Sequence, residues 1–384
     1  MGLGKVLRTK AKWILKVSPD SAGDAHGTIY PGLFRIARPA GRQRSARSDG
    51  DFVYRLAGDA VRSTELLRHR LVCQDQEALL RTVLVLAHGV PSHDTFSRVF
   101  RMLDPQAFET TFRRFMQAFA QTLQGVVAID GKALRRAYER GQSHMPPIMV
   151  TAWGAQTRMA LANVLAEGNN EAAAALQLIG LLTLKGCVVT ADALHCHRAM
   201  AAAIVERGGD YALAVKDNQP ALLRDAQAAV AAATRTGASA AVSVDDGHGR
   251  DETRVAVVAP AGDMAERHGF AGLQAVAQIR SQRNGAHTER YFLLSRHYRP
   301  PEVLRIVRQH WSIENGLHWP LDVLLDEDLA RSRKDNAPAN LAVLRRLALN
   351  VARAHPDTKT SLRGKFKRAG WDEAFLFDML RHMR

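Results

Sequence analysis

The sequence predicts an α/β fold with helical regions around a mixed core, and two observations carry this prediction. Between residues 126 and 215, short apolar runs of strand length alternate with longer segments of helical periodicity. Three acidic residues also lie on separate elements: Asp130 and Asp192 end two apolar runs, and Glu314 lies in the middle of a later helical segment. We therefore expect one compact catalytic-type core, with a shared acidic site, inside the longer chain of 384 residues.

Two regions precede this core. Residues 1–70 are basic, and their stretch 18–63 is rich in Gly, Arg, Ala, Asp and Ser without a sustained period, so we expect weak structure or disorder. Residues 71–125 form a helical lead-in, where Ser92 or Asp94 precedes an apolar stripe as a helix cap would. Four phenylalanines at helical spacing follow, and such a stripe predicts packing in the core rather than stacking on bases.

The third region, residues 126–384, opens with seven elements. We predict strands at 126–130, 148–154 and 159–166, a helix at 169–182, a strand at 187–192, a helix at 197–209 and a strand at 211–215. Three strands followed by alternating helices and strands are typical of a ribonuclease-H-like fold. That fold places the first aspartate on the first strand and the second on the fourth, which are the places of Asp130 and Asp192.

A β-rich insertion is predicted over residues 235–300. Its glycine-rich turns separate short apolar runs at 254–259, 273–279 and 290–295. The segment that follows has helical periodicity and contains Glu314, so the last carboxylate of the core is expected from a helix. A further helix is predicted over residues 337–354.

The net charge of +15 is concentrated at the two ends of the chain. Residues 1–70 and residues 331–384 each carry a net charge of +8, whereas residues 71–330 carry −1. Basic ends around a neutral centre favour a nucleic-acid partner, because Lys and Arg neutralise phosphates. The alternative is that the basic ends serve solubility or contact RNA nonspecifically.

Several classes of protein are disfavoured. Three cysteines do not make a disulfide framework. No run of 18 apolar residues exists, so no membrane partner is expected. The charged N-terminus is not followed by an apolar segment of the secretory type. We therefore expect a cytoplasmic protein.

The three acidic residues are the predicted catalytic and metal-binding residues. Carboxylate oxygens are hard ligands suited to Mg²⁺ or Mn²⁺, and a pair of such ions can promote phosphodiester cleavage. We expect Asp130, Asp192 and Glu314 to hold two ions together, with Asp130 bridging them. For a single aspartate at a strand end, a turn or a helix cap is a competing explanation.

Basic residues near these positions are candidate DNA contacts. Lys132, Arg135 and Arg136 directly follow Asp130 and would meet phosphates next to the cut, or form only a solvated basic turn. Lys216 follows the strand at 211–215, at the sheet edge where ligands tend to sit in α/β folds. Arg345 and Arg346, on one side of the helix at 337–354, complete the predicted set from the later part of the chain.

Histidines flank the glutamate. His310, Glu314 and His318 recur every four residues, which places their side chains on one face of a helix. We assign the two histidines to DNA contact or to positioning of the scissile phosphate. A structural zinc patch is the alternative, although the spacing is not that of a zinc-protease motif.

At these residues the chain resembles a known family. The segments VVAIDGK, VVTADALHCHRA, GGDYALAVKDNQP, HWSIENGLHWPLDV and NAPANLAVLRRLALN are similar, in order and spacing, to bacterial insertion-sequence transposases of the DDE class, and most of all to the H-repeat-associated (ISAs-type) group. The resemblance covers roughly residues 75–355. It implies Mg²⁺-dependent cleavage at the terminal repeats of the element and joining of the 3′-OH to target DNA. It also implies Asp130, Asp192 and Glu314 as catalytic residues, and a homodimer in a synaptic complex.

Two other functions remain open at this stage. Residues 1–70 do not resemble the family's usual N-terminal region, which favours an inactive relic that only binds DNA. The acidic trio is intact, which favours the enzyme. A ribonuclease-H-like nuclease without strand transfer is the third possibility, but the long insertion between Asp192 and Glu314 argues against a minimal nuclease.

Overall fold

The computed structural model describes residues 14–16, 35–37, 77, 81, 85–120, 124–137, 145–245 and 252–382. Most of residues 1–70 and most of residues 71–84, the first part of the predicted helical lead-in, lie outside these residues. Within the N-terminal region the structure describes two short strands, β1 (Ile14–Lys16) and β2 (Arg35–Ala37), which pair antiparallel. The division at residues 70 and 125 stays a prediction.

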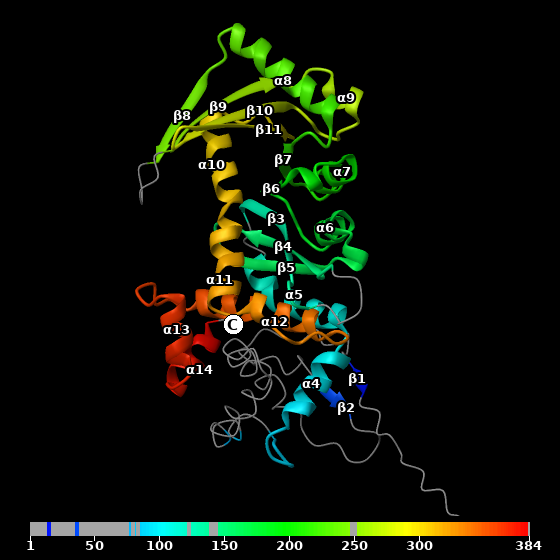
Figure 1. Ribbon diagram of the computed structural model, residues 1–384, viewed down its shortest axis with the longest axis vertical. Coiled ribbons are helices and arrows are strands. Elements are labelled where there is room, and N and C mark those ends of the chain that lie inside the picture. The colour runs from blue at the N-terminus through cyan, green and yellow to red at the C-terminus, as the bar shows by residue number, and fades with distance from the viewer. Residues whose placement is uncertain are drawn as a thin grey trace, which may run out of the picture.

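One nine-stranded mixed sheet organises the rest of the described chain (Figure 1). Its strands are β3 (Gly125–Ala133), β4 (Ile148–Gly154), β5 (Met159–Leu165), β6 (Cys187–Ala191), β7 (Asp210–Val215), β8 (Ala240–Asp245), β9 (Glu252–Pro260), β10 (Ala275–Arg283) and β11 (Ala286–Leu294). They lie in the order β5-β4-β3-β6-β7-β11-β10-β9-β8. The pairs β3–β6 and β6–β7 are parallel, and the other pairs of this sheet are antiparallel.

The predicted ribonuclease-H-like core is confirmed. The connections between its parallel strands contain helices α6 (Glu171–Gly180) and α7 (Arg198–Glu206), so the chain follows the order β-β-β-α-β-α-β. The apolar runs that predicted strands at 126–130, 148–154 and 187–192 lie in β3, β4 and β6, because these strands are buried on both faces and read as continuous apolar segments.

The β-rich insertion continues this sheet. Strand β11 pairs antiparallel with β7, with Tyr291 opposite Val215 and Leu294 opposite Ala212. The three predicted apolar runs correspond to β9, β10 and β11. Strand β8, helix α8 (Pro220–Arg235) and helix α9 (Met264–His268) are not predicted from the sequence. Strand β8 is an edge strand with exposed Val242 and Val244, and the alanine-rich α8 buries only a narrow stripe of Leu222, Ala226 and Val230.

Helices cover both faces of the sheet. Apolar side chains of α6, α7 and α8 cover one face: α6 packs on β3 and β4, α7 on β7, and α8 on β9 and β10. On the opposite face, α10 (Pro300–His310) lies across the middle of the sheet with Val303 and Ile306 buried beneath it. Figure 1 shows α6 and α7 on the right of the sheet, α8 above the upper strands and α10 on the left.

The lead-in helices pack on the β4–β5 end of the sheet together with α12 (Ala337–Ala354). Helix α4 (His93–Met102) begins at Ser92, whose hydroxyl accepts a hydrogen bond from the Thr95 amide, so Ser92 is its cap. Phe108 and Phe112 of α5 (Pro105–Ala120) are buried in the core, as their spacing predicts.

Buried amides hold this layer together. Asn340 of α12 donates hydrogen bonds to two carbonyl oxygens of the α4 segment, and Asn350 exchanges two hydrogen bonds with the backbone of Ala160 in β5. Helices α13 (Leu362–Ala369) and α14 (Glu373–Arg381) follow α12. Within the described part of the chain, no helix is both long enough and apolar enough to span a bilayer.

Candidate active site

The parallel pairing of β3 and β6 brings the two aspartates to neighbouring positions. The last registered pair of these strands is Ile129 with Ala191, so Asp130 and Asp192 are the next residues along each strand. Because parallel strands end at the same edge of a sheet, both carboxylates emerge there. Asp130 has a side chain 24% exposed and Asp192 one 45% exposed, so the pair lies at the boundary between core and solvent.

Glu314 comes from an irregular turn in the helical segment that crosses the sheet. Residues Glu314–His318 form a π-helical turn between α10 and α11 (Trp319–Val323). Such turns are often found at functional sites. Here the turn rests on Trp153 of β4: a Cβ added at Gly316 would lie 2.5 Å from the Trp153 ring, and the Trp153 indole donates to the Ser312 hydroxyl at 3.0 Å.

Arg353 of α12 contacts both the turn and Trp153. Its guanidinium lies 4.8 Å from the centre of the Trp153 ring and donates a hydrogen bond to the carbonyl oxygen of Gly316. Burial lowers the pKa of Arg353 to about 9. The residue four positions after Gly316 is Pro320, which has no N–H, so a side chain of α12 donates to this carbonyl in its place.

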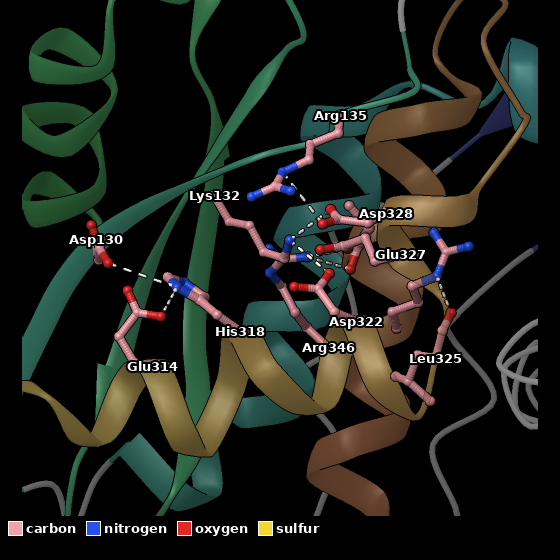
Figure 2. A network of polar contacts seen from close by, with 12 residues as sticks. Asp130, Lys132, Arg135, Glu314, His318, Asp322, Leu325, Glu327, Asp328 and Arg346 are labelled. Atoms are coloured by element: carbon pink, nitrogen blue, oxygen red, sulfur yellow. Dashed lines mark hydrogen bonds and ion pairs between the residues drawn. The ribbon is translucent and has the colours of Figure 1, made fainter.

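The carboxylates of Glu314 and Asp130 both lie beside the imidazole of His318 (Figure 2). The His318 Nδ1 atom lies 3.7 Å from an oxygen of Asp130 and 3.5 Å from an oxygen of Glu314. Burial raises the pKa of Asp130 to about 6; the nearby His318 opposes this rise, whereas the charges of Glu314 and Asp192 add to it. Contact with His318 holds the pKa of Glu314 below its usual value. The three predicted carboxylates are thus close enough to influence one another.

Asp192 has its own histidine and lysine. His310 Nε2 lies 3.9 Å from Asp192, while His310 Nδ1 is within hydrogen-bonding distance of the Thr190 hydroxyl at 3.0 Å. Burial lowers the pKa of His310. Lys216 Nζ lies 3.9 Å from the other Asp192 oxygen. Because Lys216 follows β7, its placement at the carboxyl edge of the sheet agrees with the position expected from the sequence.

Five of the predicted DNA contacts are buried, and three of these, Lys132, Arg345 and Arg346, are also bonded to groups within the protein, which argues against DNA contact for them. Lys132, which shares a face of β3 with Asp130, is bonded to Asp322 at 2.8 Å and to Asp328 at 2.9 Å. Arg346 is fully buried and pairs with Glu327 at 2.9 Å.

Arg345 is likewise buried and donates to the carbonyl oxygen of Leu325. Figure 2 shows Lys132 and Arg346 with their acidic partners beside the carboxylate site. Desolvation of Lys and Arg is unfavourable unless they are paired, and here the acidic residues after Glu314 supply the partners. The network joins β3 and α12 to the segment that carries Glu314.

The other predicted contacts differ in exposure. Arg135 is 75% exposed and Lys216 is 60% exposed, and Arg136 is also exposed, so all three are accessible to a polyanion. His310 and His318 are buried beside the carboxylates, which suits contact with the site better than contact with a DNA surface. They do not form a zinc patch with Glu314, because His310 faces Asp192 and Thr190.

The donor set suits a divalent cation. One oxygen of Asp130, one oxygen of Glu314 and a nitrogen of His318 lie within 4.8 Å of one another. Hard carboxylate oxygens at a half-buried edge are the usual ligands of Mg²⁺ and Mn²⁺. The supporting residues Asp322, Asp328 and Thr190 are not predicted from the sequence, since short-range patterns carry no signal for partners far apart in the chain.

Comparisons with known proteins agree with this geometry. Residues 121–351 match the family model of the transposase DDE domain, and residues 62–116 match the model of a region associated with that domain. The matched domain covers more than half of the chain and contains all three carboxylates. This chain belongs to the DDE transposase family.

Relatives within the family include two Escherichia coli proteins. The candidate transposase YncI of strain O157:H7 is 30% identical over 76% of this chain and 78% of its own length. The candidate H repeat-associated transposase YhhI of strain K12 is 29% identical over 76% of this chain and 81% of its own length. The predicted similarity to the H-repeat-associated group is therefore confirmed. A piggyBac transposase synaptic complex with hairpin DNA superposes with a TM-score of 0.43 at 14% identity, covering 88% of this chain and 73% of that chain.

Proposed function

We propose that this DDE family member is a DNA transposase. It would hydrolyse phosphodiesters at the terminal repeats of an insertion sequence and transfer the resulting 3′-OH into target DNA. The observation that carries the proposal is the convergence of Asp130, Asp192 and Glu314 from two strand ends and a π-helical turn. These residues would hold two Mg²⁺ or Mn²⁺ ions, which activate a nucleophile and stabilise the leaving oxygen when bound.

The remaining residues position rather than react. Lys132 pairs with Asp322 and Asp328 and so fixes the end of β3 relative to the helical segment that carries Glu314. Arg135, Arg136 and Lys216 are the accessible cations around the carboxylates and would neutralise phosphates of the bound DNA. A homodimer on two element ends would supply one such site for each end.

Nicking of supercoiled DNA that carries the flanking element ends tests this function. The wild type should nick only with Mg²⁺ or Mn²⁺, and Asp192→Ala should lower the rate at least 1000-fold, because it removes a metal ligand. The matched control is Asp263→Ala, which removes a 69% exposed aspartate of the insertion and should nick at the wild-type rate.

The failures of this experiment separate the alternatives. DNA binding without nicking by the wild type would indicate an inactive relic. Nicking without joining of a supplied 3′-OH end to target DNA would indicate a nuclease that lacks strand transfer. Equal nicking by the wild type and Asp192→Ala would remove the carboxylate site from the reaction.

A further inference from the structure

His318 stands among the carboxylates in a way that its predicted role in DNA contact does not explain. Its Nδ1 atom is 3.7 Å from Asp130 Oδ2 and 3.5 Å from Glu314 Oε2. Good N–H···O hydrogen bonds are about 2.7–3.2 Å long. Two ligands of one cation at roughly 2.1 Å lie about 3.0–3.5 Å apart. The spacing around His318 is thus closer to that of ligands around a shared ion than to that of a hydrogen bond.

The position of His318 is fixed by its element. It closes the π-helical turn that begins with Glu314, and its neighbours Leu317 and Leu321 are fully buried in the core. The His318 side chain is itself only 9% exposed, so it cannot swing out to a DNA surface without unpacking the turn. The imidazole therefore faces the same point as the two carboxylates in the folded protein (Figure 2).

The other histidine of the site differs. His310 Nδ1 is engaged with the Thr190 hydroxyl, and His310 Nε2 approaches only Asp192, at 3.9 Å. Only His318 groups with two carboxylates, since Asp130, Glu314 and His318 have ligand atoms within 4.8 Å of one another. One histidine of the pair is therefore placed as a ligand, and the other as a support for Asp192.

We propose that His318 is a direct nitrogen ligand of the divalent ion held by Asp130 and Glu314. This inference rests on the proposed metal-dependent function and specifies the ion that the site selects. Mg²⁺ takes oxygen ligands and water, whereas imidazole is a ligand of transition metals. The mixed set of two oxygens and one nitrogen therefore favours Mn²⁺ over Mg²⁺ at this position.

Mn²⁺ binding to the full-length protein, without DNA, tests the proposal. Pulsed electron paramagnetic resonance of the bound Mn²⁺ should show coupling to an imidazole ¹⁴N nucleus. His318→Leu, which keeps an apolar side chain in the buried position, should abolish this coupling and weaken Mn²⁺ binding at least 10-fold. Mg²⁺ affinity, measured by competition, should change less than about 3-fold, because oxygen ligands dominate its binding.

Two control variants locate the signal. His310→Leu, on the Asp192 side of the site, should retain the nitrogen coupling. His382→Leu should also retain it; this residue belongs to a separate group with His355 and Asp378 near the C-terminus, which is the other described cluster able to hold a metal. Circular dichroism and urea unfolding in EDTA establish whether each variant is folded. If His318→Leu does not fold, His318→Gln provides a second, polar replacement.

The outcomes are decisive. Nitrogen coupling that persists in both His318 variants would overturn the proposal. Tighter Mn²⁺ binding by these variants would also overturn it, because His318 would then be a positive charge that competes with the ion. Failure of the proposed function looks different: Mn²⁺ would bind with nitrogen coupling, yet no DNA would be nicked. Nicking with Mn²⁺ but no nitrogen coupling in the wild type would reject the ligand while keeping the transposase.

Discussion

At the scale of single residues, the site brings together carboxylates whose negative charges repel one another. Asp130 lies near Glu314 and Asp192, and its burial raises its pKa to about 6. His318 offsets part of this effect, because its approach to both Asp130 and Glu314 lowers their pKa values. A metal-free site of this kind stores unfavourable electrostatic energy, which a bound divalent cation would relieve.

The pKa of Asp130 predicts a specific dependence of stability on pH. The folded protein binds the Asp130 proton more tightly than the unfolded chain, so ionisation destabilises the fold as pH rises from about 4 to about 6. Asp130→Asn removes this charge. In EDTA at pH 7.5 the variant should therefore be more stable than the wild type by about 2 kcal/mol, a value reduced for partial solvent exposure.

Urea denaturation between pH 4.5 and pH 7.5 measures this difference, which should shrink toward the acid end of the range. Asp263→Asn is the control, because its side chain is 69% exposed and loses only an exposed ion pair with Arg267, which should change the free energy of unfolding by less than about 1 kcal/mol. A less stable Asp130→Asn variant at pH 7.5 would show that His318 compensates the Asp130 charge more strongly than burial opposes it.

At the scale of elements, the π-helical turn is the feature that sets the position of Glu314. Gly316 allows the turn to lie against Trp153, and an alanine Cβ at this position would approach a rigid indole ring to 2.5 Å. Trp153 is fully buried and bonded to Ser312, so the helical segment must move rather than the ring.

Gly316→Ala should consequently displace Glu314. We expect a loss of about 1–3 kcal/mol in the free energy of unfolding, as for other overpacked sites, and at least a 10-fold fall in metal-dependent nicking. The matched control is Gly180→Ala at the end of α6, where the nearest atom to the new Cβ is 3.8 Å away and belongs to a flexible arginine. That variant should be neutral or slightly stabilised. Unchanged nicking by Gly316→Ala would mean that the turn does not set the position of Glu314.

The elements also show how far sequence reasoning reaches. Strands such as β4 and β6 are predicted correctly because a strand that is buried on both faces has a continuous run of apolar residues in the sequence. Asp130 and Asp192 follow from the same pattern, since each closes such a run. The helix around Glu314 is predicted, but its π-turn is not, because helical periodicity carries no signal for such a turn or for its contacts with Trp153, which is far away in the chain.

Charge is where the sequence misleads. Arg345 and Arg346 form a basic pair that looks like a surface for phosphates, yet both are buried. Their partners, Leu325 and Glu327, approach only when the chain turns after α11 to bring α12 onto the sheet. In the sequence, a buried basic residue that pairs with a distant group looks the same as one that contacts DNA. Only the three-dimensional structure, which shows the pairing, distinguishes the two roles.

At the scale of the whole molecule, the insertion and the catalytic core share one sheet. Strand β11 pairs with β7, and α10 packs on strands of both parts before it leads to Glu314. Leu293 of β11 is fully buried in the same core cluster as Val127 and Val189 of the two strands that carry the aspartates. The insertion should therefore unfold together with the core as one cooperative unit.

Leu293→Ala tests this cooperativity. Loss of a buried leucine should lower the free energy of unfolding by about 2–4 kcal/mol. Hydrogen exchange followed by mass spectrometry should show an equal loss of protection in β4 and in β10, because both strands open only when the whole sheet unfolds. Val242→Ala, on the exposed face of β8, should change neither strand by more than about 0.5 kcal/mol. A loss confined to β10 would show that the insertion unfolds by itself, and the position of Glu314 would then have to be set by the core alone.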